Sequence, residues 1–126
     1  MPANMKPILL LSLAAVLMVG CKTSQNFAPH VSQSLSVNIY ASGRIDQHWN
    51  ISPESKEHQL LVEWLTAHQT GWKRSWVTYA PRTLVSGTNF SMNIHPNGVI
   101  INARGRQYET DAPASDFQFL NHAPGT

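Results

Sequence analysis

The sequence has few of the features that indicate a particular chemistry. Cys21 is the one cysteine in 126 residues, so no disulfide can form within one molecule. Charged residues make up 13% of the chain, with nine Lys and Arg against seven Asp and Glu, and the basic residues form no stripe. Proteins that bind phosphate backbones need clustered Lys and Arg, so we expect no nucleic acid partner.

Motifs for catalysis and for cofactors are also missing. The six histidines include no HExxH pair, no serine lies in a G-x-S-x-G sequence, and no glycine loop has the spacing that holds phosphates. His58 and His68 fall on different turns of the helix predicted below, too far apart to share one ion. We therefore expect no metal and no cofactor, and the sequence leans away from an enzyme.

One long apolar run lies at the start of the chain, in "MPANMKPILLLSLAAVLMVGC". Lys6 and the amino group form a short positive segment, and Pro7 to Val19 is uncharged. This run is shorter than the ~20 residues that span a bilayer comfortably. A positive segment, a short apolar run and then the small Gly20 are typical of a secretory signal peptide.

The tetrapeptide Met18-Val19-Gly20-Cys21 resembles a bacterial lipobox. The resemblance covers residues 1–21. It implies that residues 1–20 are a lipoprotein signal peptide and that Cys21 carries lipid, with palmitate as a typical chain. Lys22 stands where Asp would be the usual inner-membrane retention signal, so the resemblance implies an outer-membrane anchor facing the periplasm. The alternative is an ordinary signal peptide or a small membrane anchor in which the cysteine is incidental.

The remaining chain divides by composition into three parts. Residues 21–33 are polar, contain a proline and have no periodicity, so they are predicted to be the lipidated cysteine and a flexible tether. Residues 34–120 are predicted to form a single globular domain, and 121–126 a tail.

Alternating apolar residues predict several strands. Leu35, Val37 and Ile39 begin a hairpin with strands near 34–41 and 44–51. Further strands are expected at 72–80, 90–94 and 99–103, with 95–98 as a turn, and "RQYET" as an extension or another strand.

One long amphipathic helix is predicted over about 53–70. Ser52 can cap it, Pro53 suits its first turn, and Leu61, Trp64 and Leu65 share one face. Short loops between strands favour antiparallel pairing. The expected fold is therefore a small two-layer α+β domain, an antiparallel sheet of about five strands with this helix packed on one face.

Two candidate sites follow from side-chain type. Trp72, Lys73, Arg74 and Trp76 put two aromatic rings beside two cations, a suitable platform for a sugar, a peptidoglycan stem or a partner protein. The alternative is that both tryptophans close the core and stack on their own basic neighbours.

The second candidate is a weaker catalytic one. Asp46 and His48 lie two residues apart on a predicted strand, and a serine such as Ser75, Ser86 or Ser91 could complete a hydrolase triad. The alternative is a solvated strand face.

Together these features favour a membrane-anchored cell-envelope lipoprotein that acts as a non-catalytic binding module in the periplasm. Its expected partners are the membrane, through the lipid anchor, and an envelope protein or peptidoglycan. Two alternatives stay open: a small envelope hydrolase that uses His48 and Asp46, and an accessory subunit of an envelope complex.

Overall fold

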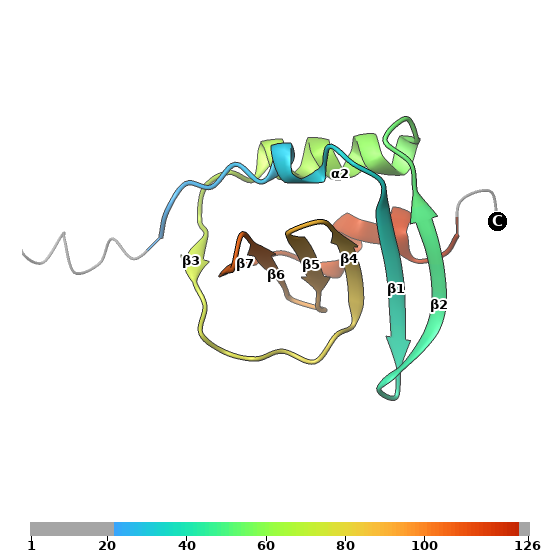
Figure 1. The fold of residues 1–126 in the computed structure, drawn as a ribbon. Coiled ribbons are helices and arrows are strands. Elements are labelled where there is room, and N and C mark those ends of the chain that lie inside the picture. Colours follow the sequence, from blue (N-terminus) through green and yellow to red (C-terminus); the bar gives the residue numbers. More distant parts are fainter. Residues whose placement is uncertain (1–21, 124–126) are drawn as a thin grey trace, which may run out of the picture.

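The computed structural model describes residues 22–123, so the predicted signal peptide and the predicted lipidation of Cys21 lie outside the described residues. The described chain forms an α+β domain around a seven-stranded sheet (Figure 1). All neighbouring strands pair antiparallel. The predicted α+β class with an antiparallel sheet is confirmed, and the sheet has seven strands where about five were expected.

The strands run across the sheet in the order β2-β1-β4-β5-β6-β7-β3. Both predicted hairpins are present, as the pairs β1–β2 and β5–β6. The bounds of the strands are β1 (Leu35–Ala41), β2 (Arg44–Ile51), β3 (Lys73–Arg74), β4 (Thr83–Gly87), β5 (Phe90–Ile94), β6 (Gly98–Ala103) and β7 (Arg106–Asp111). Because β3 and β4 follow each other in sequence but are separated by β5, β6 and β7, their connection must cross the sheet.

Helix α2 (Lys56–Ala67) is shorter than the predicted 53–70. Its N-cap is Ser55, whose Oγ accepts a hydrogen bond from the backbone N–H of His58 at 3.1 Å, a typical capping contact. Ser52, the predicted cap, instead closes a turn, since its carbonyl accepts from the Ser55 backbone N–H at 3.1 Å. The helix ends where His68 leaves the helical region, with φ −120° and ψ 55°.

The core lies on one face of the sheet. Val37, Val85, Met92 and Ile101 form a row across β1, β4, β5 and β6, and each is 0% exposed. Leu61, Trp64 and Leu65 of α2 belong to the same core cluster, as does Phe117 of the 3-10 segment η3 (Ala114–Leu120).

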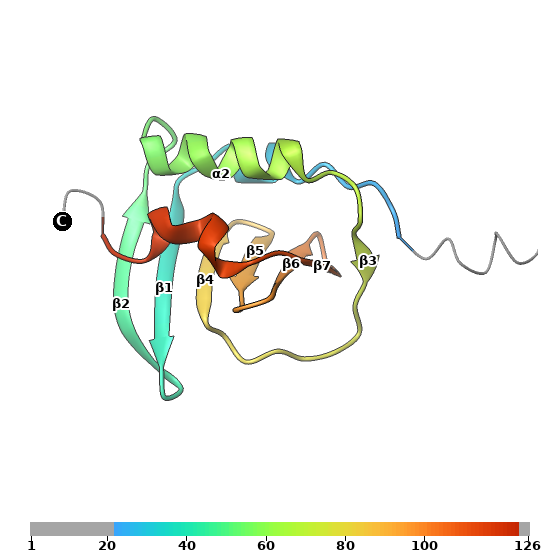
Figure 2. The same cartoon turned by 180° about the vertical axis from the view of Figure 1, so that it is seen from behind.

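Helix α2 and η3 contact each other over this core (Figure 2). The Trp64 indole Nε1 donates to Asp116 Oδ2 at 3.1 Å, and the Trp64 and Phe117 rings lie 4.7 Å apart between centroids. The helical elements therefore cover one face of the sheet, here called the inner face, and the opposite face is called the outer face.

The prediction of a flexible tether over 21–33 is wrong for most of this segment. Thr23 and Trp72 exchange two backbone hydrogen bonds, of 2.6 and 3.2 Å. Phe27 is 3% exposed, and Val31, at the end of the 3-10 segment η2 (Ala28–Val31), is 0% exposed. Phe27 and Val31 are isolated apolar residues in a polar stretch and form no periodic pattern. The sequence therefore did not indicate that both are buried in the core.

Candidate functional site

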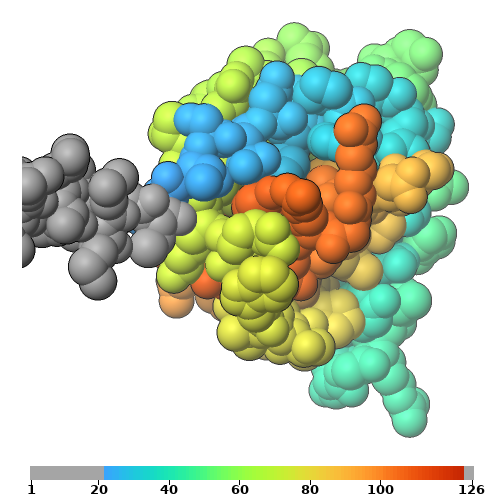
Figure 3. All heavy atoms as spheres, turned by 60° about the vertical axis from the view of Figure 1, so that its left-hand side comes forward, coloured from blue at the N-terminus to red at the C-terminus, as the bar shows by residue number. Residues whose placement is uncertain are grey.

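The connection between β3 and β4 crosses the outer face of the sheet, and residues 75–82 are here called the strap. Asn93 points to the outer face, because Met92 and Ile94 on either side of it are buried in the core, and Gln107 does so because the next residue, Tyr108, is buried. Gln107 Nε2 donates to the Val77 carbonyl at 2.6 Å, and Asn93 Nδ2 donates to the Ala80 carbonyl at 3.0 Å. The strap is thereby fixed to β7 and β5 and forms a ridge beside β3 (Figure 3).

The predicted strand over 72–80 exists only as Lys73 and Arg74, which pair with Glu109 and Tyr108 of β7. One further ladder hydrogen bond joins the Ser75 N–H to the Gln107 carbonyl at 2.9 Å. Beyond it the chain leaves the sheet edge for the strap. The alternation of side chains in this segment therefore reflects an extended strap and not a paired strand.

The structure separates the four residues of the predicted aromatic platform. Trp72 is 0% exposed, its Nε1 donates to the His68 carbonyl at 2.6 Å, and its ring packs edge-on against Phe27. Trp72 is therefore a core residue and cannot touch a surface ligand. Trp76, in contrast, is 82% exposed.

Arg74 holds the exposed tryptophan in place. Its guanidinium carbon lies 4.5 Å from the centroid of the Trp76 ring and 5.5 Å from that of Tyr108. A cation between two rings stabilises both contacts and limits the motion of the indole. Lys73 points elsewhere, to Glu109 and a neighbouring cleft.

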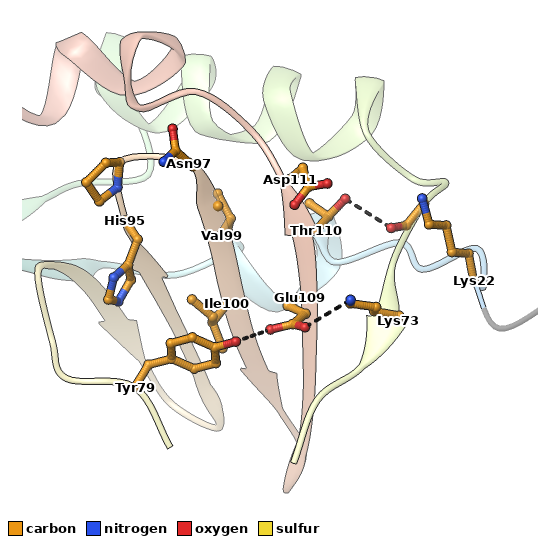
Figure 4. A pocket seen from close by; sticks show the side chains of 13 residues that line it. Lys22, Lys73, Tyr79, His95, Asn97, Val99, Ile100, Glu109, Thr110 and Asp111 are labelled. Carbon is orange, nitrogen blue, oxygen red and sulfur yellow. Dashed lines mark hydrogen bonds and ion pairs between the residues drawn. The ribbon is translucent and has the colours of Figure 1, made fainter. Parts of the chain in front are cut away.

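That cleft, of about 570 Å³, opens on the outer face between the strap, β7 and the turn from β5 to β6 (Figure 4). Its polar lining includes Lys22, Lys73, Tyr79, His95, Glu109 and Asp111. These residues come from separate parts of the chain, so the cleft exists only once the strap has crossed the sheet.

A short network lies at the centre of the cleft (Figure 4). The Tyr79 hydroxyl donates to Glu109 Oε2, and Lys73 Nζ lies 3.4 Å from Glu109 Oε1. The hydrogen bond from Tyr79 lowers the pKa of Glu109 below 4.5; Lys73 adds to this effect, and burial opposes it. The same hydrogen bond, with burial, raises the pKa of Tyr79 above 10.0. At neutral pH Glu109 is therefore ionised and Tyr79 is protonated.

His95 lies beside this network, with its ring centroid 5.6 Å from that of Tyr79 in a T-shaped contact. Its Nε2 atom is buried and makes no hydrogen bond of good geometry to the described residues. Burial lowers the pKa of His95 below 6.5, and Arg82 adds to the effect, while the Ala80 carbonyl acts against it. The imidazole of His95 is therefore packed against Tyr79 at the edge of the cleft, with its Nε2 atom shielded from solvent.

The predicted catalytic pair does not come together. His48 is exposed, and its Nδ1 lies 2.5 Å from Asn38 Oδ1 on the neighbouring strand. The register between β1 and β2 shifts between Ile39 and Tyr40, which leaves Asp46 as the extra residue of a bulge. The period of two that placed Asp46 and His48 on one strand face is interrupted there.

The serines that could complete a triad lie elsewhere. Ser75 is 5% exposed at the β3 edge and accepts from Gln107 Nε2 at 3.0 Å. Ser86 and Ser91 face each other on β4 and β5. Within residues 22–123 no hydrogen-bonded Ser-His-Asp arrangement is assembled.

No group of three His, Cys, Asp or Glu side chains within residues 22–123 could hold a metal ion. None of the helices in this part of the chain is long and apolar enough to cross a membrane.

Comparison with known proteins finds no match to a family model, a curated protein or a solved structure.

Sequence reasoning missed Tyr79, His95 and Glu109 as site residues. Tyr79 and Glu109 are 30 positions apart in the chain, so no local pattern joins them. The signal that existed was weak: the alternation in "RQYETD" puts Gln107, Glu109 and Asp111 on one polar strand face. Nothing in that pattern indicates that a strap lies over the same face.

Proposed function

We propose that this protein is a membrane-anchored cell-envelope lipoprotein whose domain acts as a non-catalytic binding module in the periplasm. The lipobox-like sequence at Cys21 supports the anchor and the outer-membrane location. The observation that carries the binding role is the polar cleft, in which Tyr79 and Lys73 hold the Glu109 carboxylate at a fixed place.

The charges around the cleft favour a ligand with both amino and carboxylate groups. Lys22 and Lys73 supply positive charge, and Glu109 and Asp111 supply negative charge. Peptidoglycan stem peptides and the surfaces of envelope proteins carry both kinds of group. Peptidoglycan and envelope proteins are accordingly the ligand classes that we propose.

The acid–base properties of the cleft support binding rather than proton transfer. A general acid or base works best with a pKa near the working pH. The shared hydrogen bond moves the pKa of Glu109 down and that of Tyr79 up, so both groups move away from neutrality. Glu109 therefore keeps its negative charge and Tyr79 keeps its proton at neutral pH, as suits a binding site.

Metabolic labelling with palmitate tests the anchor. We expect label on the wild-type protein and none on the Cys21→Ser variant, and we expect the two forms to fractionate differently between membrane and soluble material. Wild-type protein that takes up no label would contradict the anchor.

Binding to the cleft is tested with isolated peptidoglycan fragments and with cross-linking to envelope proteins. Tyr79→Phe removes one hydroxyl and its hydrogen bond to Glu109, whereas Tyr40→Phe makes the same change on β1, away from this cleft. A hydrogen bond to a charged group contributes about 1.5–3 kcal/mol, so we expect about a tenfold or greater loss of affinity for Tyr79→Phe. Equal binding by both variants and the wild type would exclude this cleft as the binding site.

A further inference from the structure

The distance between Cys21 and the folded domain is short. Thr23 is already held by its two backbone hydrogen bonds to Trp72, and Lys22 lines the cleft. A fully extended chain separates the Cα atoms of Cys21 and Thr23 by at most about 7 Å. Lipid on Cys21 would therefore keep this end of the domain at the membrane surface, and no long tether would hold it away.

The same end of the domain exposes the side chains that membrane interfaces favour. The described chain begins near β3, where Thr23 pairs with Trp72, and the strap continues from the other end of β3 (Figure 1). Trp76 is 82% and Val77 57% exposed. Trp76 follows the paired residue Trp72 by four positions, so their Cα atoms are at most about 14 Å apart.

Trp76 and Arg74 suit the boundary between acyl chains and headgroups. An indole is an amphipathic ring that concentrates at this boundary, and an arginine can extend its charge to lipid phosphates while its stem covers apolar surface. Stacking on Arg74 at 4.5 Å already orients the Trp76 ring, so little side-chain freedom remains to be lost on contact.

From these observations we propose that the edge formed by β3 and the strap lies directly on the bilayer, with Trp76 and Val77 inserted at the interface. This inference rests on the proposed lipidation of Cys21. It deepens the proposed function, because it places the binding cleft, which Lys22 and Lys73 line, next to the membrane surface.

A bilayer fits this surface better than a protein partner does. Specific protein interfaces bury roughly 1,200–2,000 Å², far more than two exposed apolar side chains supply. A short tether raises the effective concentration of the membrane to the millimolar range, so that a weak contact suffices. Lys22 and Lys73 share the cleft with the carboxylates of Glu109 and Asp111, so we expect little dependence on anionic lipid.

The fluorescence of Trp76 can report its contact with the bilayer. Trp49, Trp64 and Trp72 are each 8% exposed or less, so an added quencher reaches Trp76 first. The experiment uses the full-length lipidated protein in vesicles of phosphatidylethanolamine and phosphatidylglycerol, with and without brominated acyl chains. We expect brominated lipid to quench the wild-type emission, and we expect Trp76→Phe to lose this quenching.

A matched control moves the reporter to the opposite end of the sheet. Ile45 is 54% exposed on β2, and β2 and β3 are the two outermost strands. In the double variant Trp76→Phe/Ile45→Trp, we expect brominated lipid to leave the new indole unquenched. Quenching of both reporters to the same degree would overturn the proposed orientation.

Mass measurement of the N-terminal peptide separates the two proposals. Lipid on Cys21 together with unquenched Trp76 would overturn the membrane contact and leave the lipoprotein proposal in place. An unlipidated Cys21 would overturn both.

Discussion

The substitution Phe27→Ala decides whether the segment after Cys21 belongs to the folded domain. Phe27 is 3% exposed and packs its ring against Trp72 and Tyr108, at centroid distances of 4.9 and 5.7 Å. These partners come from the β3 edge and from β7, so Phe27 joins the N-terminal segment to the far edge of the sheet. The exposed Ser24 in the same segment offers a control.

The expected effect is large compared with the stability of a small domain. Truncation of a buried phenylalanine to alanine costs about 3–5 kcal/mol, since it removes apolar contacts and leaves a cavity. The free energy of unfolding of natural domains is only about 5–15 kcal/mol. For a domain of about 100 residues, each 1 kcal/mol lowers the melting temperature by about 4–8 °C. A flexible tether would instead predict a change within about 0.5 kcal/mol.

Urea unfolding, followed by tryptophan fluorescence, measures this difference directly. We expect the midpoint for Phe27→Ala to fall well below that of the wild type, and Ser24→Ala to unfold like the wild type. A Phe27→Ala protein as stable as Ser24→Ala would refute the assignment of residues 23–31 to the core.

Two further predictions concern the outer face, and a third concerns Gly87 on β4. Above pH 4.5 the ionised Glu109 stabilises the fold, because its pKa is lower in the folded domain, and this contribution is lost as the pH falls through the lowered value. Glu109→Gln should therefore cost about 1–3 kcal/mol in urea unfolding at pH 7, with a smaller difference in acid. A constant difference at all pH values would contradict this. By NMR titration, His95 should titrate below 6.5, with His95→Gln assigning the resonance; a midpoint above 6.5 would show that burial does not dominate. In Gly87→Ala the new Cβ would lie 2.7 Å from Gln33 Cδ and 2.8 Å from Leu35 Cδ2, so overpacking should cost about 1–3 kcal/mol in urea unfolding. A Gly87→Ala protein as stable as the wild type would contradict this, since it would show that the Gln33 and Leu35 side chains move aside at no cost.

The elements that the sequence predicted well are those whose signal is local. In β1, Leu35, Val37 and Ile39 alternate with polar residues, and the paired strand follows after a short turn. In α2, Leu61, Trp64 and Leu65 recur at helical spacing. Each pattern lies within one element and reports which face that element buries. The class of the domain follows from the order of such elements.

The candidate site depended on contacts that no local pattern contains. Trp72 and Trp76 look alike in the sequence, yet one is 0% and the other 82% exposed. The difference arises because Phe27 and the helix end cover Trp72, whereas the chain leaves the sheet edge before Trp76.

The amino-acid sequence by itself therefore determined the helix, the two hairpins and the antiparallel α+β class, since periodicity records the burial of one face along a single element. Tertiary structure alone decided three features: the N-terminal segment inserts Phe27 and Val31 into the core, the strap crosses β5 to β7, and Tyr79 meets Glu109. The physical reason is that burial and hydrogen bonding at these positions depend on segments tens of residues away, and the path of the chain sets those distances.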